Sequence, residues 1–288
     1  ERGSKLCQVV RSDILNLVGE RVKMQKYDDL AYVTNGRSRQ KLDLFLPDVG
    51  KKRPLLIWVH GGGFRTGSKK DHVPLAYLER GFAVASLNYR LSQDAIFPAQ
   101  IEDVKAAVRW LRANAKKYRL DPNRFGAWGE SAGGHLVALL GVTGNTSTFD
   151  VGEHLEISSQ VQAVVDYFGP TDFLQMDTQR LPEGMLHDPP DSPESELIGG
   201  AIQTHKDRVA RANPITYVTR DAPPFLIVHG DHDPLVPYHQ SVLLYNALVA
   251  HGVPVSFYTV IGGGHGNFKD PKVAEITLNF FERHLQSQ

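Results

Sequence analysis

The chain has 288 residues, of which 41% are hydrophobic and 22% charged, a composition typical of a globular protein and long enough for one large domain. The 32 lysines and arginines equal the 32 aspartates and glutamates, so the zero net charge argues against a nucleic-acid or membrane-surface partner. No apolar run reaches the 18 residues expected of a membrane span, and Cys7, the only cysteine, excludes an internal disulfide.

Runs typical of strands alternate with runs typical of helices along most of the chain. After an N-terminal lead, the alternation over 40–47 predicts an early antiparallel edge strand. Further strands are predicted over 55–60, 82–88, 124–128, 161–168, 224–229 and 255–260. Helices are predicted over 73–80, 98–118, 131–142, 238–251 and 271–285. This order favours an α/β fold with a mostly parallel sheet flanked by helices.

The segment 174–213, rich in proline, aspartate and glycine, fits neither pattern. Because it lies between two predicted strands, we expect a small lid or cap insertion. We therefore predict a single domain over 1–288 that contains this insertion.

Glycines cluster directly after the predicted strand that ends near Val59, in the motif His60-Gly61-Gly62-Gly63. Consecutive glycines let backbone N–H groups face a ligand without obstruction by side chains. Taken alone, the motif is also compatible with a tight surface turn. His60 is expected to brace this loop and not to transfer protons.

A second glycine-rich turn, Gly129-Glu130-Ser131-Ala132-Gly133-Gly134, separates a predicted strand from a predicted helix. A reversal this tight leaves no room for a Cβ atom beside the serine and exposes the Ser131 hydroxyl at a helix N-terminus, where negative charge is stabilised. With the first motif, it predicts a nucleophile whose oxyanion is held by the N–H groups of Gly62, Gly63 and Ala132.

A serine nucleophile needs a base, and His265 is the best candidate among 12 histidines. It lies in a glycine-rich loop between the last predicted strand and helix, at the carboxyl end of the sheet, where open α/β sheets bind ligands. His135, one helical turn after Ser131, is expected to be structural. Six others have no companion motif and are expected to be exposed: His72, His154, His187, His205, His251 and His284.

The orienting acid is expected just after the predicted strand that ends at His229. Asp233 is preferred, because the loop there can direct it at the base. Asp231 is the alternative, with loop-holding hydrogen bonds as its other role, and Asp172 is more distant. The cluster over 229–233 could also suggest a metal site, but no second ligand group at metal-site spacing occurs, so no metal is predicted.

The order Ser131, Asp233, His265 and the two glycine motifs resemble α/β-hydrolases of the esterase/lipase group related to hormone-sensitive lipase. The chain departs from that group in a lead too short for a large helical cap and in Glu130, where aspartate is usual. From about residue 40 onward it is more similar still to bacterial feruloyl and acetyl-xylan esterases of the BD-FAE-like family. The segments that carry this similarity are Asn88-Tyr89-Arg90-Leu91-Ser92, 97–103, 166–172 and 191–195.

The resemblance implies a serine carboxylic-ester hydrolase that works by two-step acyl transfer and needs no cofactor. It implies a small ester or acylated carbohydrate as substrate, with short or phenolic acyl groups on plant polysaccharides. A general short-chain carboxylesterase and an aryl formamidase or other amide hydrolase stay open as alternatives. A non-catalytic binding protein of this fold is disfavoured because all three triad residues are present. The sequence leaves the oligomeric state undecided.

Four apolar residues are expected to shape the substrate pocket. Phe64 follows the oxyanion glycines, Leu235 is near the acid, and Met176 and Met185 belong to the predicted lid. Because the chain begins with Glu1 and not with methionine, an N-terminal segment is expected to have been removed, either a signal peptide or residues trimmed for expression. Together with the implied polysaccharide substrate, this favours secretion or a periplasmic location over a cytoplasmic one.

Overall fold

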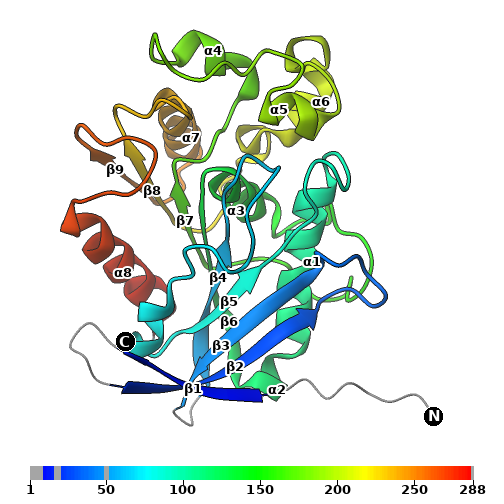
Figure 1. Ribbon diagram of the computed structural model, residues 1–288, viewed down its shortest axis with the longest axis vertical. Coiled ribbons are helices and arrows are strands. Elements are labelled where there is room, and N and C mark those ends of the chain that lie inside the picture. Colours follow the sequence, from blue (N-terminus) through cyan, green and yellow to red (C-terminus); the bar gives the residue numbers. More distant parts are fainter. Residues whose placement is uncertain (1–8, 16–20, 49–51, 287–288) are drawn as a thin grey trace.

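The computed structural model of the protein describes residues 9–15, 21–48 and 52–286. Nine strands of this part form one sheet in the order β1-β2-β3-β5-β4-β6-β7-β8-β9 (Figure 1). They are β1 (Val9–Leu15), β2 (Arg21–Ala31), β3 (Lys41–Pro47), β4 (Arg53–Val59), β5 (Ala83–Leu87), β6 (Leu120–Glu130), β7 (Ala163–Tyr167), β8 (Phe225–Gly230) and β9 (Val255–Val260). The six neighbouring strands β5, β4, β6, β7, β8 and β9 are parallel to one another. The pairs β1–β2, β2–β3 and β3–β5 are antiparallel. The mostly parallel sheet is confirmed.

The prediction of an edge strand over 40–47 is wrong in one respect. The strand β3 is antiparallel as predicted, but β2 pairs with its outer side and β1 pairs with β2. The sequence of β2 is rich in charged residues, and its register with β3 shifts between Tyr27 and Leu30. This interruption removes the regular alternation by which a strand is recognised in a sequence.

Helices cover both faces of the sheet (Figure 1). They are η1 (Leu75–Arg80), α1 (Ala99–Ala113), α2 (Ala115–Tyr118), α3 (Ala132–Thr143), α7 (His239–Ala250) and α8 (Pro271–Leu285), where η marks a 3₁₀ helix. Buried residues of α1, α3 and α7 pack in one core, and those of η1 and α8 pack in a second core on the opposite face. The predicted helix over 98–118 is divided at Asn114, which ends α1 and precedes α2.

The segment between β7 and β8 consists of short helices that lie above the carboxyl ends of the strands (Figure 1). They are η2 (Phe173–Gln175), α4 (Met176–Gln179), α5 (Pro193–Ile198), η3 (Ile202–Thr204), α6 (Lys206–Ala212) and η4 (Pro214–Tyr217). None has more than seven residues, which is too short for a recognisable helical period. Leu197, Ile202 and Val209 join the core beneath. The role of 174–213 as a lid stays a prediction.

Among the described helices, none combines the length and the apolar character needed to cross a membrane.

Candidate active site

Ser131 lies in the sharp turn between β6 and α3. Its backbone has φ 55° and ψ −121°, a conformation that costs energy in a residue with a side chain and recurs at functional sites. Neighbouring glycines are required, because a Cβ atom at Gly133 would lie 2.1 Å from the Val59 carbonyl oxygen. A Cβ atom at Gly129 would lie 2.3 Å from the Gly133 carbonyl oxygen. The backbone N–H of Ser131 donates to the Tyr167 carbonyl at 2.8 Å, which fixes the turn to β7.

The structure brings Ser131, His265 and Asp233 together from the ends of three strands. His265, in the loop after β9, has its Nε2 atom 2.9 Å from Ser131 Oγ. Its Nδ1 atom lies 2.6 Å from Asp233 Oδ2, in the turn after β8. The ring of Phe168 lies against the imidazole with centroids 4.5 Å apart. Because Asp233 accepts at Nδ1, the proton of neutral His265 is held there and Nε2 is left as an acceptor for the hydroxyl.

Asp233 is 2% exposed, and four donors surround its carboxylate. Oδ1 accepts the backbone N–H groups of Leu235 and Val236 at 2.8 and 3.0 Å. Oδ2 accepts from His265 and, at 3.1 Å, from Nε2 of His229. Burial alone would raise the pKa of Asp233, but the hydrogen bonds from His229 and His265 outweigh it and hold this pKa well below its usual range. The acid is therefore ionised at neutral pH.

His229 is a member of the site whose role the sequence did not reveal. It is fully buried, and its Nδ1 atom lies 2.8 Å from the Ser241 hydroxyl. Its Nε2 atom lies within hydrogen-bond distance of both Asp233 and the Val236 carbonyl, so it carries the proton. The only sequence signal was its position at the strand end, which suggested a ligand and not a support for the acid.

The alternative acids have other partners. Asp231 Oδ1 lies 2.7 Å from His232 Nδ1 and accepts the Gly262 N–H at 2.6 Å, contacts that lower the pKa of Asp231. Asp172 accepts the Leu174 N–H and caps η2. Within the described ranges no group of three or more His, Cys, Asp or Glu side chains could hold a metal ion.

Three backbone amides near Ser131 have no acceptor among the described residues: those of Gly62, Gly63 and Ala132. Gly62 and Gly63 have φ values of 108° and 58° and line the same cavity as Ser131. A Cβ atom at Gly62 would lie 2.5 Å from the Thr66 carbonyl oxygen, so the turn requires glycine there. Ala132 is the first residue of α3, at the positive end of the helix dipole.

His60 and His135 have structural positions. His60 is stacked on Tyr89 at 4.5 Å, and its Nδ1 atom lies 2.7 Å from the Gly61 carbonyl. His135 is fully buried, with Nδ1 3.0 Å from the Pro170 carbonyl. Burial lowers the pKa of each to about 4, which keeps both rings neutral at pH 7.

Ser131 and His265 line a cavity of about 370 Å³. Two of the four residues expected at its wall, Met185 and Leu235, line it. The prediction for the other two is wrong, because Phe64 and Met176 are 1% and 0% exposed and belong to the core. Phe64 packs edge-on against the rings of His135 and Phe173. Burial of such large apolar side chains is more favourable than exposure at a hydrated cavity mouth.

Two histidines that were expected to be exposed line this cavity, and the expectation is wrong for His187. His187 is buried, and its Nδ1 atom lies 2.8 Å from Glu194 Oε2. Burial lowers the pKa of His187, but the hydrogen bond with Glu194 outweighs it and the pKa is raised. His72 has a side chain that is 69% exposed, yet its Nδ1 atom lies 2.6 Å from Glu130 Oε1. The sequence offers no signal for either pair.

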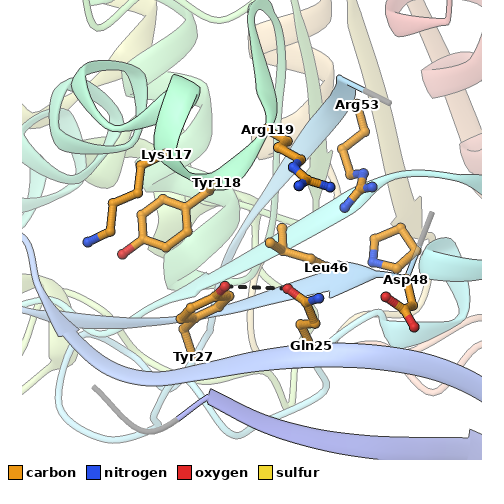
Figure 2. A pocket seen from close by; sticks show the side chains of 9 residues that line it. Gln25, Tyr27, Leu46, Asp48, Arg53, Lys117, Tyr118 and Arg119 are labelled. Atoms are coloured by element: carbon orange, nitrogen blue, oxygen red, sulfur yellow. Dashed lines mark hydrogen bonds between the residues drawn. The ribbon is translucent and has the colours of Figure 1, made fainter. Parts of the chain in front are cut away.

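A different cavity of about 330 Å³ lies at the opposite end of the sheet, between β2, β3 and α2 (Figure 2). Its described lining contains Arg53, Lys117 and Arg119 but no serine, cysteine or histidine. The Tyr27 hydroxyl there lies 3.4 Å from Gln25 Oε1. Because its described lining offers no serine or cysteine beside a histidine, this cavity is not the candidate site for acyl transfer.

The chain is similar in sequence and in fold to known esterases. Residues 42–248 match the family model BD-FAE. A truncated carbohydrate esterase from gut microbiota is 35% identical with a TM-score of 0.84, over 91% of this chain and 96% of that one. A bifunctional GH43-CE protein of Bacteroides eggerthii is 36% identical with a TM-score of 0.83, over 90% of this chain and 38% of that one.

Esterase LipQ of Mycobacterium tuberculosis is 32% identical over 94% of this chain and 66% of its own length. The chain spans about half to two thirds of the length of the curated relatives it matches.

Proposed function

The chain belongs to the BD-FAE family and has the α/β-hydrolase fold, and on this basis we propose that it hydrolyses carboxylic esters with Ser131, His265 and Asp233 as its triad. The observation that carries the proposal is the continuous series of contacts from the Ser131 hydroxyl through His265 to the buried Asp233. The three free amides beside the hydroxyl supply the second requirement of acyl transfer, a place for the oxyanion.

In the first half-reaction, Ser131 Oγ attacks the ester carbonyl carbon while His265 Nε2 accepts its proton. The carbonyl π electrons move to the oxygen, which then accepts hydrogen bonds from Gly62, Gly63 and Ala132, each worth roughly 3 kcal/mol in the transition state. The C–O bond to the alcohol breaks, and His265 gives its proton to the departing oxygen. Water then attacks the acyl-enzyme with His265 again as base, which releases the acid and restores Ser131.

Asp233 supports both half-reactions by its charge and by its position. It keeps the Nδ1 proton of His265 in place, and its carboxylate stabilises the imidazolium formed in each half-reaction. The low pKa of Asp233 means that this carboxylate does not take the proton itself. His229 holds the carboxylate from the other side and is a positioning residue.

We infer that the substrates carry short or phenolic acyl groups on plant polysaccharides. The cavity is near the lower end of the range for ligand sites, which limits the acyl group to a small one. Its wall combines Met185 and Leu235 with the polar pairs His72–Glu130 and His187–Glu194. A long fatty chain would cover these polar groups without giving them hydrogen bonds, whereas a hydroxylated ester can replace the water they lose.

The test is the kcat/KM of the wild type and of Ser131→Ala on p-nitrophenyl acetate, p-nitrophenyl octanoate, methyl ferulate and acetylated xylan. We expect turnover of the acetate, the ferulate and acetylated xylan that falls by ~10⁶ in Ser131→Ala. A fluorophosphonate probe should label the wild type at Ser131 only. Activity that survives in Ser131→Ala, or an unlabelled serine, would overturn the proposal.

A further inference from the structure

We propose that a groove beside the catalytic cavity binds a neutral sugar ring in the alcohol part of the substrate, an inference that rests on the proposed esterase function. The groove has a volume of about 350 Å³ and lies between the carboxyl ends of β6 and β7 and the start of α8. The proposal depends on three properties of the groove: its continuity with the catalytic cavity, its aromatic wall and its free polar groups.

The groove and the catalytic cavity are continuous. Four residues line both of them: Glu130, Phe168, Gly266 and Asn267. Glu130 directly precedes Ser131, and Gly266 directly follows His265. A molecule whose ester bond lies at Ser131 can therefore extend its next ring past Glu130 into the groove. The ring has only a short distance to span, because Glu130 of the shared wall is next to Ser131 and Gly266 is next to His265.

Aromatic side chains form one wall of the groove. Trp128, Tyr167 and Phe268 are half-buried, so part of each side chain stays accessible. Trp128 packs on Tyr167 with centroids 5.3 Å apart, and Phe268 lies 6.3 Å from Tyr167. These mutual contacts hold the rings in place without a ligand. A rigid aromatic surface suits the apolar C–H face of a pyranose ring.

Polar side chains that line the groove have unused hydrogen-bonding capacity. Asn267 and Lys269 are exposed, and neither side chain has a hydrogen-bond or ion-pair partner within the ranges 21–48 and 52–286. Glu130 uses Oε1 for His72, and within the same ranges Oε2 has no partner. The groove thus offers an amide, an ammonium group and a carboxylate oxygen beside the aromatic surface. This mixture of donors and acceptors matches the hydroxyl groups of a sugar.

Other occupants fit less well. A fatty acyl chain would cover Lys269 and Glu130 without satisfying them. An anionic ring would face the carboxylates of Glu130 and Asp270, against one lysine. The neutral ring is therefore the occupant that uses both the aromatic wall and the polar groups.

The experiment compares two acetyl esters that differ in the alcohol. We would measure kcat and KM on acetylated xylobiose and on p-nitrophenyl acetate for the wild type, Lys269→Ala and Phe268→Leu. Both substituted residues line the groove and not the catalytic cavity. The matched control is Lys116→Ala, which removes an exposed lysine of α2 at the far end of the sheet. Inhibition of p-nitrophenyl acetate hydrolysis by unmodified xylobiose gives a second readout that needs no sugar ester to be cleaved.

We expect each groove variant to raise KM for acetylated xylobiose roughly threefold to tenfold, the loss of one hydrogen bond or one ring contact. The kcat/KM ratio of the sugar ester to p-nitrophenyl acetate should fall by the same factor, and Lys116→Ala should keep the wild-type ratio. An unchanged ratio in both groove variants overturns the sugar site. A wild type that hydrolyses p-nitrophenyl acetate but neither cleaves the sugar ester nor is inhibited by xylobiose also overturns it, while the esterase proposal survives. A wild type inactive on p-nitrophenyl acetate contradicts the esterase proposal itself.

Discussion

Replacement of Asp233 by asparagine tests whether this carboxylate orients the base. The Oδ1 atom of Asp233 accepts two backbone N–H groups, from Leu235 and Val236. An asparagine at this position must keep its only oxygen there, so its NH₂ group takes the place of Oδ2 and faces His265 Nδ1. That NH₂ group donates, which forces the proton of His265 onto Nε2. The ring then presents a proton to the Ser131 hydroxyl, where an acceptor is required.

The expected loss follows from this change of tautomer. In a Ser-His-Asp triad the same replacement lowers kcat by about 10⁴, which corresponds to a barrier increase of about 5 kcal/mol. The loss here should be of that order at pH 7. Asp233→Asn keeps the size of the side chain and the two backbone hydrogen bonds. A thermal unfolding curve should therefore show a folded protein at the assay temperature.

The assay is kcat on p-nitrophenyl acetate for the wild type, Asp233→Asn and the matched control Asp231→Asn. Asp231 is two residues away and half-buried, and its partners are Gly262 N and His232, not the base. An amide oxygen can still accept from Gly262, so the control should lose less than about threefold. If Asp233→Asn keeps more than a tenth of the wild-type kcat, or if Asp231→Asn loses as much, the assignment of the acid is refuted.

Four further outcomes are expected. Burial raises the pKa of Asp166 to about 7, above its value of about 3.9 in an unfolded chain, so its stabilising contribution is complete below pH 4 and is lost as pH rises through 7. The free energy of unfolding of Asp166→Asn, measured with urea, should accordingly rise relative to that of the wild type by up to about 4 kcal/mol between pH 4 and 9. A difference that does not change with pH would contradict this. His135→Gln should keep kcat within about threefold, because its neutral ring is buried against a backbone carbonyl; a 100-fold loss would assign it a chemical role. Gly133→Ala should abolish turnover and lower Tm, because its Cβ atom would meet the Val59 carbonyl at 2.1 Å; a normal enzyme would refute the turn geometry. Rates on p-nitrophenyl esters should fall from C2 to C12, and a steady rise would contradict the small acyl site.

The contacts of Ser131, His265 and Asp233 could be expected from the sequence because each residue follows a strand of a parallel sheet. The carboxyl ends of such strands lie along one edge, so position in the chain converts directly into position in space. The pairs His72–Glu130 and His187–Glu194 do not follow this rule. Each depends on where a loop or a short helix folds back over that edge, and the length of the connection does not determine this. The same reason explains why the buried positions of Phe64 and Met176 were missed.

The outer strand β2 shows a second limit. Its charged residues lie on an antiparallel ribbon beyond the buried part of the sheet, where few positions must be apolar. The pairing of β2 with β3 uses backbone hydrogen bonds, and only a few described β2 side chains, among them Met24 and Leu30, are buried and need to be apolar. Central strands such as β4, in which every residue is buried, were predicted within two residues at each end.

The two aspartates after β8, Asp231 and Asp233, both help to position His265. Asp231 accepts the N–H of Gly262 and so ties the turn after β8 to the loop that follows β9. The backbone N–H of His232 donates to the Gly263 carbonyl and makes the same connection a second time. With this loop fixed at its start, Asp233 needs to set only the rotation of the His265 ring. The candidate base is thus positioned by contacts at the sheet edge, and the segment 174–213 touches the same turn, because the Met185 N–H donates to the Pro234 carbonyl at 2.8 Å. Movement of that segment would therefore change access to the cavity and would also break the hydrogen bond that it makes beside Asp233.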